Sequence, residues 1–337
     1  MRTQVRNENA IPQANRGMWG ARLKNSKLFH AVFHGKWIVQ LKSSWQLYAM
    51  FAVPFAWFLL FSFGPMYGVL LAFKKYKIRL GILGSPWADH FGLENFIRFF
   101  NSYNFWQCLV NTFSLSLYSI AVGMPMAVIF ALMLNYARRQ RFRKTVQLTA
   151  YAPYFISQVI MVGILSLIFN PRTGVLGQII YQLTGVNILA DAGAFSSLYV
   201  FSSVWQNMGF DAILYIAALS SVDPQLHEAA RIDGATILQR IWNIDIPAIL
   251  PTFVIMLIMR VGQVLNVGQE KVLAMQNAGN METSEIISTY AYKIALASEI
   301  PDFAYSTAIS FFQAVVGLVL IVLANRISRK LADESLW

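Results

Sequence analysis

Two apolar stretches in the C-terminal half of the chain contain ionisable and amide side chains at helical spacing. Asn207 and Asp211 are four residues apart in one stretch, and Arg260, Gln263 and Asn266 follow at intervals of three in the other. Residues three or four positions apart share one face of a helix. A charge at the centre of a lipid bilayer costs roughly 2.5–3.5 kcal/mol on insertion scales, so such groups normally face a bundle interior or a cavity.

Asp211 and Arg260 carry opposite charges at similar distances from the segment that connects their two stretches. At ~1.5 Å per helical residue, Asp211 lies about 12 Å from Leu219 at the end of its stretch, and Arg260 lies about 14 Å from Pro251. We therefore expect the two side chains to form an ion pair within the bundle. The alternative is that each finds water or backbone partners separately.

The amides of these stretches have the chemistry of a sugar path. Gln206, Asn207, Gln263 and Asn266 can hydrogen-bond hydroxyl groups without adding charge, and an aromatic ring such as Phe210 covers the apolar face of a sugar ring. We predict that these five residues line a path for a saccharide. The alternative is that the amides make helix–helix hydrogen bonds and that the ring packs between helices.

The chain lacks the motifs of an enzyme or of a nucleotide-binding protein. The Gly35-Lys36 pair has no phosphate-binding loop around it, and no zinc-protease, serine-hydrolase or paired-carboxylate motif is present. His30 and His34 are four residues apart but have no third ligand, so we expect no metal site. Cys108 is the sole cysteine, which excludes an intrachain disulfide. We expect no cofactor in this chain, and any ATP and Mg²⁺ must be bound elsewhere.

The composition is that of a polytopic membrane protein. Of the 337 residues, 56% are hydrophobic and 13% are charged, and the mean hydropathy is +0.49. A water-soluble domain cannot bury so much apolar surface. The net charge of +11 arises from basic residues between apolar stretches, which favours contact with anionic lipid over binding of nucleic acid.

The pattern predicts an all-α membrane protein with three parts. Residues 1–45 form a basic N-terminal tail, within which residues 19–41 can form an amphipathic helix on the membrane surface or remain disordered. Residues 46–326 form one membrane domain, and residues 327–337 form a short tail. The six expected spans cover about 46–73, 109–134, 146–169, 196–219, 248–267 and 304–325. Residues 267–303 have no clear pattern.

The distribution of basic residues predicts the orientation. With both termini inside, 18 of the 27 Lys and Arg residues lie in cytoplasmic segments and 8 lie in external segments. Lys74, Lys75, Lys77 and Arg79 oppose this bias, but the N-terminal tail and the basic loop at 138–144 outweigh them. We expect both termini and the loop at residues 220–247 to face the cytoplasm.

That loop has the pattern of two short helices joined by a turn. Pro224 opens the first helix, Asp233-Gly234 is a turn signal, and Pro247 and Pro251 mark the return to the membrane. Residues 235–244 are expected to form the second short helix, with an apolar side. Such a segment suits docking of a partner protein.

The loop resembles the EAA loop of binding-protein-dependent ABC importer permeases. The residues that match are Glu228-Ala229-Ala230, Gly234 and Ile244-Asp245-Ile246-Pro247, with Ile246 in place of the usual Leu. Further stretches are similar to the oligosaccharide and polysaccharide branch of carbohydrate permeases, among them GPMYGVLLAFKKY (64–76), GLENFIRFF (92–100) and VWQNMGFDAILYIAAL (204–219).

The resemblance implies the six-helix, maltose-permease-like architecture of type I ABC importers in the bacterial plasma membrane. It implies as partners a second, similar permease, two cytoplasmic ATP-binding cassette subunits, and an extracytoplasmic solute-binding protein that delivers the saccharide. In the family the Glu of the loop contacts the ATPase and the Gly permits the turn. The coupling residues are then Glu228, Ala229, Ala230, Asp233, Gly234 and Ala235.

Two other classes of function fit the composition less well. A stand-alone secondary carrier or channel needs no ATPase-docking loop. A membrane-embedded glycosyltransferase would use the amides and aromatic rings as an active site, but the chain has no paired acid or metal motif. A carrier would transport solute alone, whereas a permease subunit requires an ATPase.

Overall fold

The computed structural model describes residues 44–331, and the chain divides into two compact units, residues 1–67 and 68–337. Across the described residues every regular element is helical, as predicted, apart from an isolated bridge between Lys74 and Trp87. The amphipathic helix predicted at residues 19–41 lies outside the described residues.

The described part of the first unit is a helical segment with an exposed, apolar surface. It comprises α2 (Trp45–Phe58), the π-helical turn η1 (Leu59–Phe63) and α3 (Gly64–Met66). None of its side chains from Trp45 to Tyr67 is buried. Pro65 lacks an N–H and would clash with the carbonyl four residues earlier, at Phe61, so the wider π turn that contains Phe61 accommodates it.

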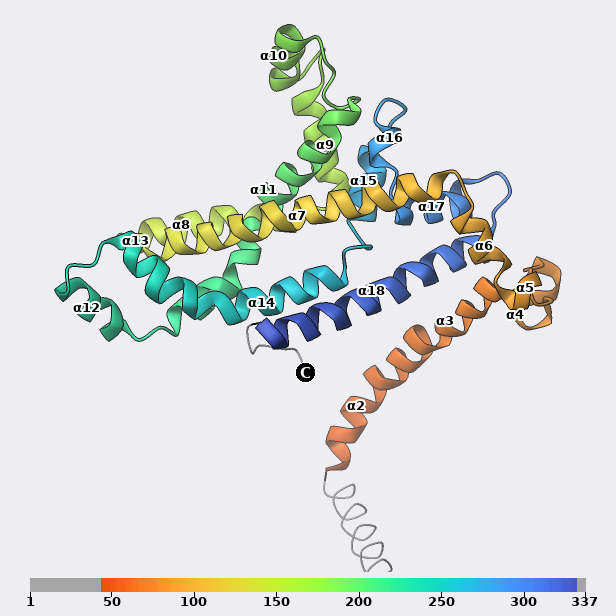
Figure 1. Cartoon of the computed structure of the whole chain (residues 1–337), viewed down its shortest axis with the longest axis horizontal. Helices are drawn as coiled ribbons and strands as arrows, with labels where there is room; N and C mark the ends of the chain where they lie inside the picture. Colours follow the sequence, from red (N-terminus) through yellow and green to blue (C-terminus); the bar gives the residue numbers. More distant parts are fainter. Residues whose placement is uncertain (1–43, 332–337) are drawn as a thin grey trace, which may run out of the picture. The chain divides into compact units, whose positions relative to one another are not determined.

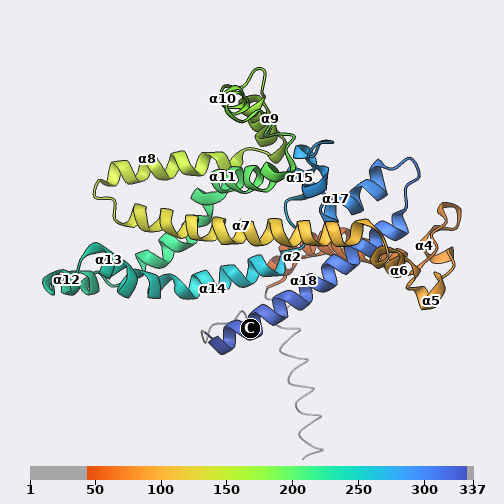
Figure 2. The same cartoon turned by 45° about the horizontal axis from the view of Figure 1, so that its top comes forward.

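The second unit is built on four long helices. They are α7 (Asn104–Asn135), α11 (Ala192–Ser220), α14 (Ile246–Gly262) and α18 (Phe303–Leu331). Helix α7 packs along α11, and α14 packs along α18. Both views show the α12–α13 loop at one end of α7 and the α4–α6 segment at the other (Figures 1 and 2).

Shorter helices connect the long ones. Before α7 come η2 (Tyr67–Phe73), η3 (Ile78–Leu80), α4 (Gly81–Gly84), α5 (Asp89–Gly92) and α6 (Glu94–Phe100). Between α7 and α11 come α8 (Gln140–Tyr151), η4 (Ala152–Phe155), α9 (Gln158–Phe169) and α10 (Val175–Thr184). Between α14 and α18 come α15 (Gln269–Met275), α16 (Met281–Ser284), α17 (Ile287–Tyr292) and the π turn η6 (Lys293–Ala297).

The expected count of six spans is not confirmed. Within residues 44–331, four helical segments are long and apolar enough to cross a membrane: Trp45–Phe73, Asn104–Asn135, Ile237–Gly262 and Phe303–Lys330. The predicted third span is bent by 102° between η4 and α9, and it makes a fifth candidate if the bent pair counts as one span. Helix α11 occupies the place of the predicted fourth span and contains Gln206, Asn207 and Asp211, but it is not among these candidate segments.

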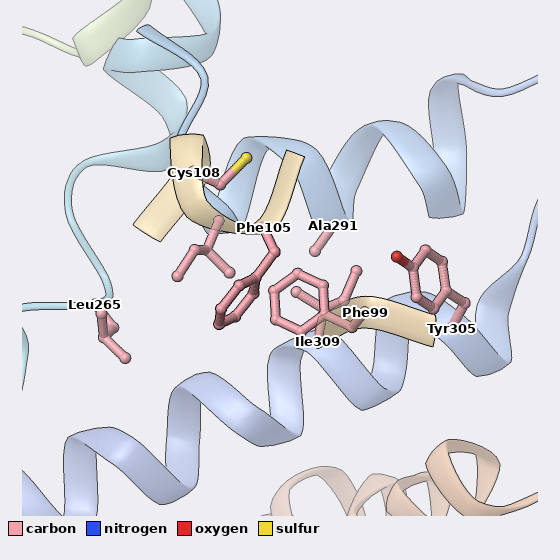
Figure 3. Packing of buried hydrophobic residues seen from close by; sticks show 8 residues of the cluster. Phe99, Phe105, Cys108, Leu265, Ala291, Tyr305 and Ile309 are labelled. Atoms are coloured by element: carbon pink, nitrogen blue, oxygen red, sulfur yellow. The ribbon is translucent and has the colours of Figure 1, made fainter. Parts of the chain in front are cut away.

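Three apolar clusters hold the second unit together. One joins Ala131 of α7, Tyr215 of α11 and Ile249 of α14. A second joins Leu115, Val200, Val272 and Ile286, and so attaches α15 and α17 to the α7–α11 pair. The third cluster, in Figure 3, packs Phe99, Phe105 and Tyr305 edge to face. Ring pairs in this geometry contribute ~0.5–1.5 kcal/mol beyond the burial of their area.

Side-chain donors satisfy carbonyl groups where the helices are interrupted. Gln206 Nε2 of α11 donates to the Ile156 carbonyl at the bend between η4 and α9, at 2.8 Å. Beyond the end of α14, Ser116 donates to the Val264 carbonyl, and Gln313 Nε2 donates to the Leu265 carbonyl at 2.8 Å. Because an unpaired carbonyl in an apolar interior costs several kcal/mol, these bonds permit helix breaks within the bundle.

The segment without a predicted pattern, residues 267–303, is helical and anchored by amides. Asn277 and Asn280 both donate to the Leu189 carbonyl, at 2.7 and 3.1 Å, and Asn111 of α7 donates to the Glu282 carbonyl at 2.8 Å. The helices of this segment are too short for periodicity to reveal them, and these long-range hydrogen bonds position them.

Candidate functional site: coupling loop and polar cavity

The coupling loop, residues 220–247, contains two helices joined by a tightly hydrogen-bonded turn. Helix α12 (Pro224–Ile232) begins at Pro224, and Asp223 caps it by accepting a bond from the Gln225 N–H at 2.9 Å. At its end the Gly234 N–H donates to Arg231, and the Ala235 N–H donates to the Ala230 carbonyl at 2.8 Å. This is a Schellman motif, which requires a left-handed residue, and Gly234 has φ +79°.

The second helix of the loop is continuous with the helix that follows it. Thr236 and Gln239 form a capping box at the start of α13 (Ile237–Arg240). The π-helical turn η5 (Ile241–Asp245) then leads directly into α14. The short helix expected at residues 235–244 and the span expected from residue 248 are therefore one helical segment: the π turn contains Asn243, whose carbonyl Pro247 would otherwise meet, so the helix continues past Pro247.

The predicted coupling residues lie on the surface or in the turn itself. Glu228, Ala229, Asp233 and Gly234 are exposed, whereas Ala230 and Ala235 are half-buried. Large apolar side chains are exposed beside them, with Ile232 at 87%, Leu238 at 68% and Trp242 at 68%. Nothing in the described part of the chain covers this acidic and apolar surface, which is suited to contact with another protein.

A buried carboxylate attaches the loop to two long helices. Asp245 is fully buried at the base of α14. Its Oδ2 accepts a 2.7 Å hydrogen bond from the Tyr136 hydroxyl at the end of α7, and its Oδ1 lies 3.3 Å from Nε2 of His227 in α12. Arg240, also buried, lies over the Tyr136 ring, 5.6 Å from its centroid. The coupling helix is thus connected to both α7 and α14.

The hydroxyl of Tyr136 stays protonated in this position. Burial, and then the adjacent Asp245 carboxylate, raise the pKa of Tyr136 to about 12. The hydroxyl therefore remains a hydrogen-bond donor throughout the physiological pH range.

A polar cavity of about 540 Å³ lies between α7, α11, the end of α14 and α15. Its wall is rich in amide and hydroxyl groups, with one acid and two cations. The lining residues include Ser116, Ser119, Gln158, Tyr199, Ser203, Asn207, Arg260, Gln263, Asn266, Glu270 and Lys271. The volume lies within the range of ligand pockets, and the polar lining suits a polar molecule better than an apolar one.

The structure brings Asp211 and Arg260 into contact. Arg260 Nη2 donates to Asp211 Oδ2 at 2.7 Å, and the two side chains are partly exposed, at 45% for Arg260 and 22% for Asp211. Arg260 also lines the cavity. The ion pair therefore connects α11 to α14 at the cavity wall.

Of the residues predicted to line a path, three line the cavity and two do not. Asn207, Gln263 and Asn266 face it. Gln206 is 1% exposed and bonded to Ile156. Phe210 stacks on Tyr154 of η4, with ring centroids 3.8 Å apart. Gln206 and Phe210 thus support the bend between η4 and α9.

Gln263 and Asn266 reach the cavity from a turn instead of a helix. Helix α14 ends at Gly262, although the predicted span continued to residue 267. The Asn266 N–H bonds to the Gln263 carbonyl at 2.9 Å. The apolar residues Val264 and Leu265 looked like a continued span, but they are buried in the unit's core within this turn.

Sequence reasoning missed several polar contributors to the cavity, among them Ser116, Gln158, Ser203 and Lys271. The serines and Gln158 have no distinctive spacing. Lys271 follows Gly268-Gln269-Glu270 in what looked like an external loop, and its burial becomes visible only when α15 packs against α9 and α11.

Comparison with known proteins identifies the family. Residues 109–333 match the model of a family described as binding-protein-dependent transport system inner membrane component. This match covers the coupling loop and the cavity. The chain belongs to this family. It is therefore a membrane-spanning permease subunit of a transporter and not a catalytic enzyme.

Two relatives and two solved structures are similar over most of this permease. The polygalacturonan/rhamnogalacturonan transport system permease protein YteP of Bacillus subtilis (strain 168) is 38% identical, over 89% of this chain and 92% of its own length. Protein LplB of the same organism is 37% identical, over 89% and 94%.

Two crystal structures of a bacterial alginate ABC transporter contain chains that match this one. In the first, a structure of a transporter that imports the acidic polysaccharide alginate, one chain superposes with a TM-score of 0.79 at 36% identity, over 88% of this permease and 99% of that chain. The second structure contains a periplasmic protein bound to an alginate pentasaccharide, and its chain matches with a TM-score of 0.79 at 35% identity, over 88% and 98%.

The first prediction concerns the buried carboxylate at the loop. Tyr136→Phe removes the hydroxyl that bonds Asp245, and loss of a hydrogen bond to a charged group costs ~1.5–3 kcal/mol. We expect a lower melting temperature of the purified transporter and less solute moved per ATP hydrolysed. Tyr103→Phe, at a side chain that is 93% exposed, is the control. Equal melting of the Tyr136 variant and the wild type would contradict this role.

The second prediction concerns the charge pair. Asp211→Arg and Arg260→Asp should each reduce the yield of assembled transporter, because each places two like charges at the cavity wall. The double exchange restores opposite charges and should recover at least half of the wild-type yield, measured by size-exclusion chromatography. If the double variant assembles no better than the weaker single variant, the pair does not hold α11 to α14.

Proposed function

We propose that this permease forms half of the translocation path of an ATP-driven importer for an oligosaccharide or polysaccharide. The coupling loop is the observation that carries the proposal. A Schellman turn and a capping box make it rigid, Asp245 attaches it to α7 and α14, and its acidic and apolar surface is uncovered in the described chain. A rigid loop of this kind can transmit the closure of an ATPase to the helices.

The proposal assigns partners to the two ends of the bundle. Two cytoplasmic ATP-binding cassette subunits bind ATP and Mg²⁺ and contact Glu228 and its neighbours, while this chain carries no cofactor of its own. A second, similar permease completes the path, and an extracytoplasmic solute-binding protein delivers the saccharide. The complex with a pentasaccharide-bound periplasmic protein supports the last partner.

The same proposal places the chain in the bacterial plasma membrane with both termini in the cytoplasm. The basic tail at residues 1–45 and the basic loop at 138–144 favour this orientation. Residues 46–326 form the membrane domain, and residues 327–337 form the cytoplasmic C-terminal tail. In Figures 1 and 2 the coupling loop and the α4–α6 segment lie at opposite ends of α7, as expected if these two segments lie on opposite sides of the membrane.

The substrate we propose is an acidic oligosaccharide. Relatives that are similar over most of the chain are named for polygalacturonan and rhamnogalacturonan, or import alginate. The amides of Asn207, Gln263 and Asn266 at the cavity suit the hydroxyl groups of such a molecule.

The third prediction tests the coupling loop. Gly234→Pro is incompatible with φ +79° and removes the N–H that bonds Arg231, and Glu228→Lys reverses the charge on the docking surface. We expect both variants to insert into the membrane and to let the transporter hydrolyse ATP. Their uptake in proteoliposomes should fall at least tenfold. The control is Gly185→Pro, the same substitution at another glycine with positive φ (+71°), which follows α10. This variant should leave the uptake per ATP hydrolysed unchanged. Wild-type uptake by either loop variant would refute the coupling role.

The fourth prediction tests the cavity. Replacing Gln263 and Asn266 together by Leu removes hydrogen-bonding groups from the cavity wall without changing the charge. We expect uptake to fall several-fold while the complex assembles normally. Gln140→Leu, at an exposed amide in the first turn of α8, is the control. Unchanged uptake by the double Leu variant would show that these amides do not line the path.

A further inference from the structure

Lys271 is a buried cation on the wall of the polar cavity. Its side chain is 2% exposed. Its ammonium donates to Ser203 Oγ at 2.7 Å and to the Tyr199 carbonyl at 3.4 Å, and it lies 5.1 Å from the centroid of the Tyr199 ring. An ammonium has three N–H donors, so one remains for a ligand.

No carboxylate neutralises this cation within the described residues. Arg260, the other cation on the cavity wall, differs in this respect, since it pairs with Asp211 at 2.7 Å. Removing an unpaired charge from water costs several kcal/mol, and burial lowers the pKa of Lys271 to about 7. An anion beside the ammonium would offset this cost and favour the protonated form.

The backbone around Lys271 is shaped to hold it against α11. A Cβ at Gly268 would overlap the Tyr199 hydroxyl, so a larger residue there would displace the Tyr199 side chain or the start of α15. Three residues later, Lys271 reaches Ser203, one turn beyond Tyr199 on the same helix. The position of the ammonium therefore follows from packing between α15 and α11 and does not depend on a flexible surface side chain.

The neighbours of Lys271 in the cavity suit the rest of a sugar acid. Asn207, Gln263 and Asn266 offer amides, and Ser116 and Ser203 offer hydroxyls. Arg260 is already engaged with Asp211, and Glu270 is exposed at the rim. Of the two cations that line the cavity, Lys271 is the one without an ion-pair partner.

We propose that Lys271 is the anion-binding residue of the cavity and contacts a carboxylate of the saccharide during its passage. The inference rests on the proposed function, because it requires that the cavity belong to the translocation path. It makes Lys271 a specificity-determining residue: the permease itself, and not only the binding protein that delivers the ligand, distinguishes acidic from neutral saccharides.

The test compares one acidic saccharide with its neutral ester. The complete importer, reconstituted in proteoliposomes with its binding protein, is supplied with tetragalacturonate or with its methyl ester, and uptake of each is measured. The binding protein is the same for every variant, so a change in the acid-to-ester ratio reports on the permease. We expect Lys271→Met and Lys271→Gln to lower this ratio about tenfold, equivalent to ~1.4 kcal/mol.

Two further variants distinguish a ligand-binding role of Lys271 from a structural role. Lys271→Arg keeps the charge and should hold the ratio within about twofold of the wild type. Lys293→Gln removes a cation that already has a carboxylate partner and lies outside the cavity, and the ratio should not change. An unchanged ratio in the Met and Gln variants, or an equal loss of acid and ester uptake with assembly intact, would overturn the proposal.

If the proposed function is wrong, the uptake experiment gives a different result. If the wild-type importer moves neither compound, the proposed saccharide function is refuted. Lys271 is then tested by equilibrium dialysis of the detergent-purified complex against tetragalacturonate alone. Weaker binding by Lys271→Gln than by the wild type would retain the anion site, and equal binding would eliminate it.

Discussion

The buried carboxylate of Asp245 is the contact on which the mechanical connections of the second unit depend. It accepts a hydrogen bond from the Tyr136 hydroxyl at the end of α7 and lies beside His227 in the coupling helix, and it directly precedes α14 in the chain. A charge that is completely removed from water is tolerated only when its partners remain in place. A displacement of α12 would therefore strain the contacts of Asp245 with α7 and α14, which gives a partner bound to the coupling helix a route to the long helices.

Polar side chains also determine where the bundle can depart from regular helix. Gln206 covers the carbonyl of Ile156 at the 102° bend, and Ser116 and Gln313 cover the carbonyls that follow α14. These interruptions create the cavity, because the turn after Gly262 turns Gln263 and Asn266 towards α7 and α11. The same amide chemistry thus has two uses: buried amides stabilise the helix breaks, and exposed amides remain available for a ligand.

Local signals in the sequence predicted much of this arrangement, whereas features that arise from packing were not predictable. The turn at Gly234 and the start of α12 at Pro224 follow from residue chemistry, and the depths of Asp211 and Arg260 were enough to bring them together. The end of α14 was missed because Val264 and Leu265 are equally compatible with a membrane helix and with a buried turn. Gln206 could not be distinguished from Asn207, since the bend that it supports lies fifty residues away in the chain. Lys271 was missed for the same reason, because its burial depends on α15 packing against α11.

The continuity of α13, η5 and α14 makes this segment a lever. Residues Ile237–Gly262 form one 26-residue helical segment, which is about 39 Å long at ~1.5 Å per residue. A tilt of about 5° around its base at the Asp245 contact would shift the far end by roughly 2–3 Å over the ~26 Å between Asp245 and Gly262. That displacement is comparable to the length of a hydrogen bond, so a small rotation at the Gly234 end is sufficient to make or break contacts at Gln263 and Asn266. The amplification comes from helix length alone and requires no unfolding along the way.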